Sequence, residues 1–201
     1  MSPETHLLAS WLVAAKTTDN PRDCRLVTLA GIVPDADGLG LIVDLVSKGF
    51  GHPTNLYQEL HHWLLHGAFG AMLISVLFGG LARRRWRVAL LSLAMFHLHL
   101  LCDLLGSRGP SVNDLWPIYY LGPFTREPVW NWQYQWRLDG WQNRIFTLAL
   151  FGTALWQGAK RGDSVVGVFN RRADAVFVAV LRKWQAGLAP HWQKIWSFVR
   201  R

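Results

Sequence analysis

The sequence predicts an all-α protein. We expect a helical bundle of two hairpins that carry His and Asp residues, with several transmembrane or membrane-embedded helices and a basic amphipathic C-terminal helix. Three observations support this fold class. Long uncharged apolar stretches alternate with short polar turns, since 51% of the 201 residues are hydrophobic and only 17% are charged. The chain has twelve tryptophans, and amphipathic aromatic residues gather at membrane interfaces. Its net charge of +8 is concentrated near the C-terminus.

The composition also excludes some protein classes and suggests two regions. Such an apolar chain is not intrinsically disordered. Its two cysteines, Cys24 and Cys102, are too few for a secreted disulfide scaffold. A length of 201 residues allows one domain or two, because a domain takes roughly 150 residues. We expect a membrane-embedded domain over residues 1–160 and a basic amphipathic tail over 161–201.

The first hairpin is predicted over residues 6–37. Two apolar runs, residues 7–15 and 26–33, flank a segment rich in Thr, Asp, Asn and Pro, which favours a turn. Both arms are too short to cross a bilayer comfortably. Glu4 precedes the first run where a signal peptide would carry Lys or Arg, so we expect this segment to stay in the mature protein.

The second hairpin contains the best transmembrane candidate. Residues 63–82 carry no Asp, Glu, Lys or Arg, and about 20 such residues span the hydrocarbon layer. Four arginines follow between positions 83 and 87, and residues 88–102 are again uncharged. The positive-inside rule places this arginine turn in the cytoplasm. Residues 145–159 form a third, shorter apolar stretch. The mean hydropathy is only +0.12, so a soluble bundle with apolar helices remains an alternative.

Ionisable residues inside apolar helices are costly and therefore indicate function. They occur in four places: His6; Asp35 and Asp37; His61, His62 and His66; His97, His99 and Asp103. His66 and Asp103 are each 18.5 residues from the midpoint of the arginine turn, so an antiparallel pair of helices places them at the same level, about 28 Å from it. His6 and Asp35 are similarly equidistant from the first turn. If the hairpins pack side by side, these groups converge.

The spacing of these residues suits a metal site. His99 and Asp103 lie at i and i+4, on one helix face, whereas His97 points elsewhere and is assigned to packing. Imidazole and carboxylate suit zinc, manganese or iron, and several carboxylates make room for a second ion. Helical spacing favours His62 as the partner of His66, while a loop position favours His61. Two adjacent metals activate water, and hydrolysis of a phosphoester is the reaction that this constellation serves best.

These motifs resemble the bacterial membrane-bound metal-dependent hydrolase family, of the LexA-regulated inner-membrane type. The family pattern is an N-terminal His, a PDxD motif, two His five residues apart, HxxxD, and a downstream WP. The sequence matches it in order over roughly residues 5–125, and the matching positions are His6, Pro34–Asp37, His61 with His66, His99–Asp103 and Trp116–Pro117. It departs from the pattern beside the central His pair, where His62, Leu65 and Gly67 replace Arg, Thr and Ser.

The resemblance implies a hydrolase in the bacterial inner membrane, with a multi-pass topology. It implies these metal ligands: His6, Asp35, Asp37, His61, His66, His99 and Asp103. Asp37 and Asp103 are the expected catalytic carboxylates, and the cofactor is a divalent metal, zinc or manganese, as one ion or two. The expected activity is hydrolysis of a lipid or nucleotide phosphoester. The alternatives are a non-catalytic membrane protein with a structural or transported metal, and a membrane-associated protein that binds a partner.

Two further segments point to the membrane. Residues 115–141 hold nine aromatic residues, which form either an interfacial belt, the interpretation we favour, or a lid whose Arg108, Arg126 or Arg137 meets a phosphate. From residue 160 onward, nine Lys and Arg stand against two Asp, and apolar residues recur at helical spacing from Val176 to Leu188. This pattern favours a helix on an anionic membrane surface over a nucleic-acid site. We therefore expect membrane lipids, and a small-molecule or lipid substrate, as partners.

Overall fold

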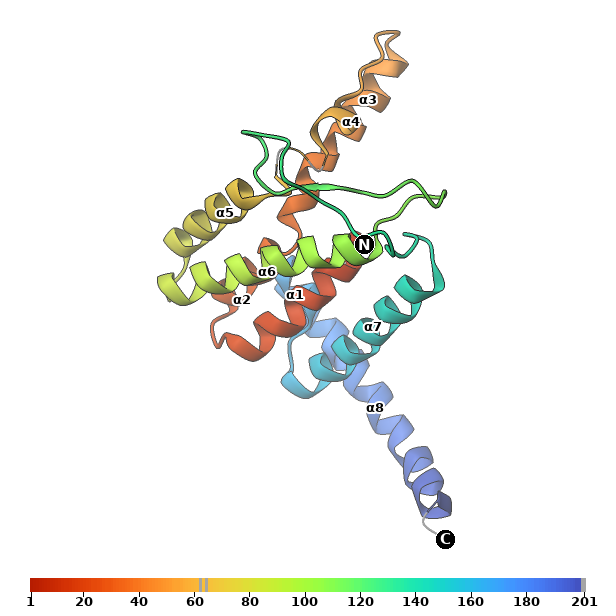
Figure 1. Cartoon of the computed structure of the whole chain (residues 1–201). Helices are drawn as coiled ribbons and strands as arrows, with labels where there is room; N and C mark the ends of the chain where they lie inside the picture. The colour runs from red at the N-terminus through yellow and green to blue at the C-terminus, as the bar shows by residue number, and fades with distance from the viewer. Residues whose placement is uncertain (62, 64, 200–201) are drawn as a thin grey trace. The chain divides into compact units, whose positions relative to one another are not determined.

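The computed structural model describes residues 1–61, 63 and 65–199, and it is predominantly helical (Figure 1). Among these residues the strands are limited to one short antiparallel pair, β1 (Ile118–Tyr119) and β2 (Val129–Trp130). The predicted all-α class is confirmed. Packing divides the chain into two compact units, Met1–Leu148 and Ala149–Arg201. The functional boundary expected at residue 160 stays a prediction, because packing alone does not define it.

The first hairpin forms as expected. Helix α1 (Pro3–Thr17) and helix α2 (Pro21–Ala30) each begin with a proline, whose fixed φ suits the first helical turn. The Asn20 side chain caps α2 by accepting the backbone N–H groups of Arg22 (2.9 Å) and Asp23 (3.4 Å). Both helices pack against α6 (Arg85–Gly106).

The second hairpin consists of α5 (Ala68–Leu81) and α6, joined by the arginine turn. The carboxylate of Asp23, only 2% exposed, accepts the backbone N–H groups of Arg83 (2.9 Å) and Arg84 (3.1 Å). This contact ties the start of α2 to the turn between α5 and α6. The closed end of the second hairpin is therefore fixed to the first.

The apolar helices differ from the predicted spans. Helix α5 begins only at Ala68, because Gly67 is extended and the Ala68 N–H donates to the Tyr120 carbonyl (2.7 Å), so the expected span over 63–82 is too long. Within the described residues, α6 is the one helix long and apolar enough to cross a membrane, and α2 with Val33–Gly49 qualifies only as a pair bent by 54°. Residues 145–159 lie in α7 (Trp141–Arg161), which does not qualify. A multi-pass topology stays a prediction.

A projecting arm follows the first hairpin. The 3₁₀ helix η1 (Val33–Leu39) leads into α3 (Gly40–Gly49) and α4 (Leu56–Leu60), which extend away from α1, α2, α5 and α6 (Figure 1). Asp44 of α3 holds the two helices together, since its carboxylate accepts the N–H groups of Leu56 and Tyr57, both at 2.8 Å. We call α3 and α4 the α3–α4 arm.

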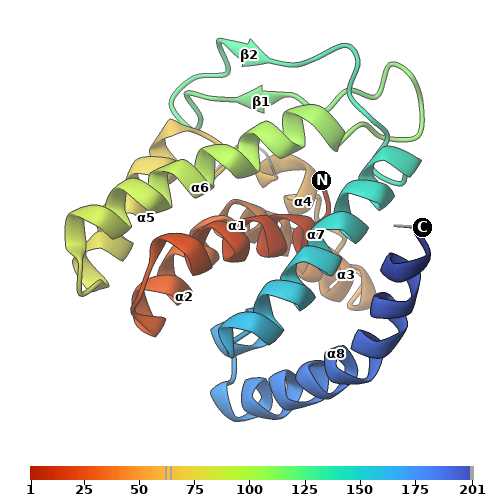
Figure 2. The same cartoon turned by 90° about the horizontal axis from the view of Figure 1, so that it is seen from below.

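The connection between α6 and α7 is held by buried amides. Gln135 is 2% exposed, and its side chain accepts the Trp116 N–H (3.0 Å) and donates to the Trp116 carbonyl (2.9 Å). Asn143 of α7 donates to the carbonyl of Gly106, the last residue of α6 (2.7 Å). Figure 2 shows the β1–β2 pair beside α6. These bonds fix Trp116 near the C-terminal end of α6.

The second unit contains the end of α7, the 3₁₀ helix η2 (Val165–Val168) and α8 (Arg171–Val199). Asp174 caps this segment, because its carboxylate accepts the N–H (2.9 Å) and hydroxyl (2.6 Å) of Ser164. Among the described side chains of α8, Val178 and Leu181 are buried, whereas Val176, Val180 and Trp184 are exposed. A helix is therefore present where one was predicted, and its contact with a membrane surface stays a prediction.

Candidate metal centre

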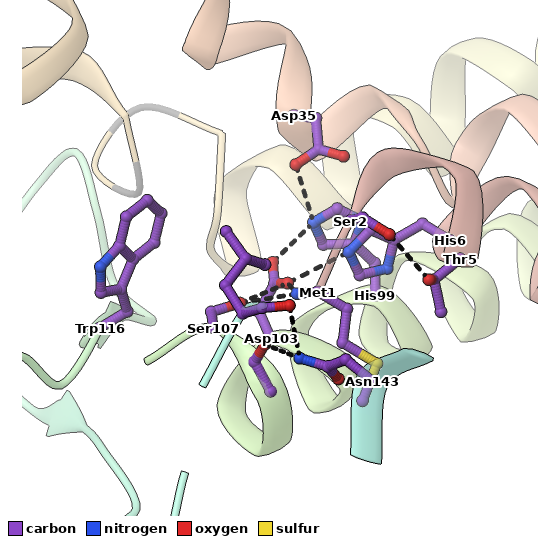
Figure 3. Close-up of polar contacts among 12 residues, drawn as sticks. Met1, Ser2, Thr5, His6, Asp35, His99, Asp103, Ser107, Trp116 and Asn143 are labelled. Atoms are coloured by element: carbon purple, nitrogen blue, oxygen red, sulfur yellow. Dashed lines mark hydrogen bonds and ion pairs between the residues drawn. The ribbon is translucent and has the colours of Figure 1, made fainter. Parts of the chain in front are cut away.

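The first cluster of candidate ligands gathers four side chains from three elements. His6 lies on α1, Asp35 on η1, and His99 and Asp103 on α6; their donor atoms all lie within 4.8 Å of one another. The His6 and His99 rings stack with centroids 3.7 Å apart, and His6 Nε2 lies 3.1 Å from Asp103 Oδ1. Figure 3 shows these side chains turned toward one another. We call them the first cluster.

His99 is held in the tautomer that a metal site requires. Its Nδ1 lies 2.9 Å from the carbonyl of Gly31, at the end of α2. Since a carbonyl only accepts, Nδ1 donates a proton to it, and the ring is held with Nε2 facing the first cluster. That Nε2 lies 2.9 Å from Asp103 Oδ2 and 3.7 Å from Asp35 Oδ1. The backbone of the first hairpin therefore orients a side chain of the second.

The second cluster is built around the buried carboxylate of Asp37. Its Oδ1 lies 2.8 Å from His61 Nδ1, and its Oδ2 lies 2.9 Å from His66 Nδ1. The Leu65 N–H also donates to Oδ2 (3.3 Å). Asp37 is thus placed either to bind an ion with the two histidines or to orient both rings. We call Asp37, His61 and His66 the second cluster.

His66 connects the two clusters. Its Nε2 lies 3.3 Å from His99 Nε2 and 3.6 Å from Asp103 Oδ2. Its other ring nitrogen contacts Asp37. The ring is completely buried, so it reaches both clusters without contacting solvent. A change at His66 is therefore expected to affect both clusters.

The surroundings of His6 and His66 shift their pKa values in opposite directions. Burial, reinforced by the neighbouring His99, lowers the pKa of His6, which is therefore a neutral imidazole at pH 7. Burial alone would lower the pKa of His66 as well, but its interactions with Asp103 and Asp37 outweigh burial and raise that pKa to about 9. Without a metal, His66 is protonated at neutral pH. A bound cation would take the place of this proton.

A cavity of about 410 Å³ opens beside the clusters. Its polar side is formed by Asp35, His61, Asp103 and Ser107. Trp116 lies on the same cavity and meets the His61 ring edge-on, with centroids 5.4 Å apart. Members of both clusters therefore face a space large enough for a small ligand.

The structure brings all seven of the expected ligands into the two clusters. Of the two alternatives His61 and His62, the structure places His61 in the second cluster, beside Asp37. His62 lies outside the described residues. His97 is confirmed as a packing residue, since its Nε2 contacts the Tyr120 hydroxyl (2.9 Å). The placement of these residues is thus established, whereas their role as ligands stays a prediction.

Four supporting residues were missed by sequence reasoning. Ser107 donates its hydroxyl to Asp103 Oδ1 (2.9 Å), and its position four residues after Asp103 on the same helix face was an available signal. The Met1 amino group also contacts Asp103 and donates to Ser107 Oγ (2.6 Å). The Gly31 carbonyl and the side-chain amide of Gln135 bond to residues distant in the sequence, and no local pattern reveals them.

The aromatic segment, residues 115–141, contains one residue that suits a lid, and the belt interpretation stays open for the others. Trp116 lines the cavity, as a lid residue would, whereas Trp132 and Trp136 are not among its described lining residues. The three arginines considered for phosphate binding are likewise not in that lining: Arg108, Arg126 and Arg137. Arg137 pairs instead with Asp139 (2.8 Å). The interfacial belt stays a prediction for the remaining aromatic residues.

Comparison with known proteins identifies a family. The sequence model of a family described as YdjM inner membrane protein matches residues 1–184. No curated protein and no solved structure matches the chain.

Proposed function

Because its residues 1–184 match that family model, the chain belongs to the YdjM inner membrane protein family, and we propose that it is a metal-dependent hydrolase that cleaves a phosphoester. The observation that carries this proposal is the junction of the two clusters, where His66 Nε2 lies 3.3 Å from His99 Nε2 and 3.6 Å from Asp103 Oδ2. Two adjacent sets of nitrogen and oxygen donors suit a pair of cations. A single cation bound at either cluster is a simpler arrangement that the same donors also allow.

The donor set and its buried atoms fit a divalent metal. Four imidazoles and three carboxylates suit zinc or manganese. Two buried polar atoms in the first cluster, His6 Nδ1 and Asp35 Oδ2, have no hydrogen-bond partner among the described residues. Buried polar atoms without partners are destabilising, and a cation in the cluster would satisfy a carboxylate oxygen there.

Bound divalent metals would supply a water of lowered pKa and polarise a phosphoryl oxygen. The protein's own residues would orient the reactants. The Gly31 carbonyl fixes the His99 ring, and Asp37 fixes the rings of His61 and His66. Such hydrogen bonds set the tautomer and direction of ligating imidazoles.

Asp103 and Asp37 take different parts in this proposal. Asp103 faces the cavity and would accept the proton of the attacking water at its carboxylate. Neighbouring groups engage both carboxylates, Asp103 through His6, His99 and Ser107 and Asp37 through His61, His66 and the Leu65 N–H, but only Asp103 is among the described residues of the cavity lining. Asp37 would therefore position the histidines and stabilise positive charge on them.

The experiment that tests this function uses the full chain in detergent micelles, loaded with zinc or manganese. It is offered bis(p-nitrophenyl) phosphate, phosphatidic acid and a nucleoside monophosphate as probes. Metal-dependent release of product is expected from at least one of them, and the Asp103→Asn variant is expected to lose it. The matched control is His97→Asn, a polar substitution on the same helix outside both clusters.

Two results would contradict the proposal. Equal turnover by Asp103→Asn and the unmodified chain would remove the catalytic role of the first cluster. Tight metal binding without turnover of any probe would favour the alternative, a membrane protein with a structural or transported metal. Both results leave the family membership unchanged.

A further inference from the structure

One cavity joins the metal-ligand clusters to an apolar wall. Besides its polar residues, the lining of the 410 Å³ cavity includes large apolar residues from η1, α3 and the connection between α6 and α7. This apolar wall consists of Leu39, Leu41, Ile42, Trp116 and Leu138. A pocket with few polar groups and a mainly apolar lining is typical of sites for organic ligands.

The apolar wall continues along α3 beyond the cavity. No side chain of α3 is buried. Its exposed apolar side chains, with the flanking Leu39 and Phe50, are 47–79% accessible: Leu39, Leu41, Ile42, Val43, Leu45, Val46 and Phe50. A contiguous apolar surface of this kind marks contact with a membrane or with another protein. Membership of an inner membrane protein family makes lipid hydrocarbon the partner that fits this surface.

The apolar wall is connected through the backbone to residues of both clusters. Asp35 and Asp37 precede Leu39 in η1, and α3 follows directly. Asp44 then fixes α3 to α4 through the N–H of Tyr57, whose ring stacks on His61 with centroids 4.7 Å apart. The α3–α4 arm therefore supplies Leu41 and Ile42 of the apolar wall, and Asp35 in η1 and His61 directly after α4 flank it at the polar side.

We infer that the substrate of the proposed hydrolase is a membrane phospholipid. Its phosphoester headgroup lies beside Asp35, His61 and Asp103. One acyl chain lies on Leu41 and Ile42 and continues along α3 into the bilayer. This inference rests on the proposed function, and it narrows the substrate from phosphoesters in general to lipids.

The charge of the cavity lining favours a lipid over a nucleotide as the ligand. Among the described residues that line the cavity there is no Arg or Lys side chain, and the Met1 amino group, which also lines it, is engaged by Asp103 and Ser107. Sites for the phosphates of soluble nucleotides use such side chains, or the N-terminus of a helix, to bind the negative charge. Here the lining offers apolar surface instead, which favours a ligand with a hydrocarbon chain.

Photo-crosslinking tests the inference without requiring turnover. The full chain in phosphatidylcholine nanodiscs is exposed to phosphatidic acid that carries a diazirine in one acyl chain, and labelled peptides are located by mass spectrometry. Labelling of the peptide that contains Trp116 reports lipid bound in the cavity. Labelling of α3 does not distinguish this, because bulk lipid also reaches α3. The test variant is Ile42→Asn. Its matched control is Val46→Asn, since these two side chains on α3 are 58% and 53% exposed and only Ile42 lines the cavity.

We expect Ile42→Asn to reduce labelling at Trp116 about tenfold, the equivalent of losing one buried aliphatic contact. Val46→Asn should label like the unmodified chain. Unchanged labelling in Ile42→Asn, or none at Trp116 in the unmodified chain, would overturn the inference. Excess phosphatidic acid should compete with the probe, whereas glycerol 3-phosphate should not; competition by both would make the ligand a soluble phosphate.

The same preparation separates this inference from the proposed function. Metal-dependent hydrolysis of phosphatidic acid, reduced by Ile42→Asn, supports both. Hydrolysis of soluble esters alone, with no specific labelling at Trp116, contradicts the lipid substrate and leaves the hydrolase. Specific labelling without hydrolysis contradicts the hydrolase and, with it, the assignment of the lipid as a substrate.

Discussion

His66 Nε2 and Asp103 Oδ2 lie 3.6 Å apart at the open end of the α5–α6 hairpin. His66 also contacts Asp37 of the second cluster, and Asp103 belongs to the first. The pair therefore joins two sets of candidate ligands into one centre. Because both side chains are buried, with 0% and 3% exposure, the contact does not depend on solvent.

The first prediction distinguishes the two adjacent histidines. His61 Nδ1 lies 2.8 Å from Asp37 Oδ1, so His61→Ala should weaken metal binding at the second cluster by on the order of 10- to 100-fold, the range for disturbing the surroundings of a bound metal. Competition with a fluorescent zinc chelator measures this affinity. His62→Ala is the control and should bind as the unmodified chain does. A larger loss in His62→Ala would assign the ligand to His62 instead.

The second prediction concerns the connection between the hairpins. Asp23→Ala removes the buried carboxylate that accepts the N–H groups of Arg83 and Arg84, which should lower the free energy of unfolding by about 2 kcal/mol. Thermal melting and denaturant titration in detergent measure the change. Asp19→Ala, which removes an exposed ion pair with Arg84, should have almost no effect. Equal melting temperatures for Asp23→Ala and Asp19→Ala would refute the structural role of Asp23.

The third prediction separates a lid from an aromatic belt. Trp116 meets His61 and lines the cavity, so Trp116→Ala should reduce turnover while leaving membrane retention unchanged. Trp132→Ala and Trp136→Ala should do the reverse, because neither is among the described lining residues. Turnover and extraction by mild detergent are compared for all three. Loss of turnover in Trp132→Ala with normal retention would contradict the belt.

The fourth prediction concerns the basic helix α8. Its exposed Val180 and Trp184, together with its Lys and Arg residues, suit the surface of an anionic bilayer. Amide hydrogen exchange over residues 176–187 should be slower in nanodiscs with phosphatidylglycerol than in phosphatidylcholine alone. Trp184→Ser should reduce this difference. Identical exchange in the two lipids would mean that α8 does not bind the anionic surface.

Local sequence patterns predicted the helices and the height along each hairpin at which the polar residues lie. Equal distances from the arginine turn placed His66 opposite Asp103, and the structure confirms that contact at 3.6 Å. Helical spacing placed His99 and Asp103 on one face, and their side chains lie 2.9 Å apart. The spacing of His99 and Asp103 follows from regular helix geometry, which the sequence determines directly, whereas His66 precedes α5, so for it only the level along the hairpin was predicted.

Other features depend on contacts between distant segments. The start of α5 at Ala68 follows from a bond to the Tyr120 carbonyl, so an uncharged run alone overestimated the helix. Asp37 lies in a 3₁₀ helix, where the 3.6-residue period does not apply, and its place between His61 and His66 could not be derived. Gln135 holds Trp116 through backbone groups, which leave no side-chain pattern.

The central claim is that the two clusters bind metal, and elemental analysis of the purified full chain tests it most directly. After reconstitution with zinc or manganese, we predict two ions per chain for the unmodified protein and for the control His97→Ala. His66→Ala, which removes the residue shared by both clusters, should lose most of this metal. No bound metal in the unmodified chain, or the same metal content in His66→Ala, would contradict the account.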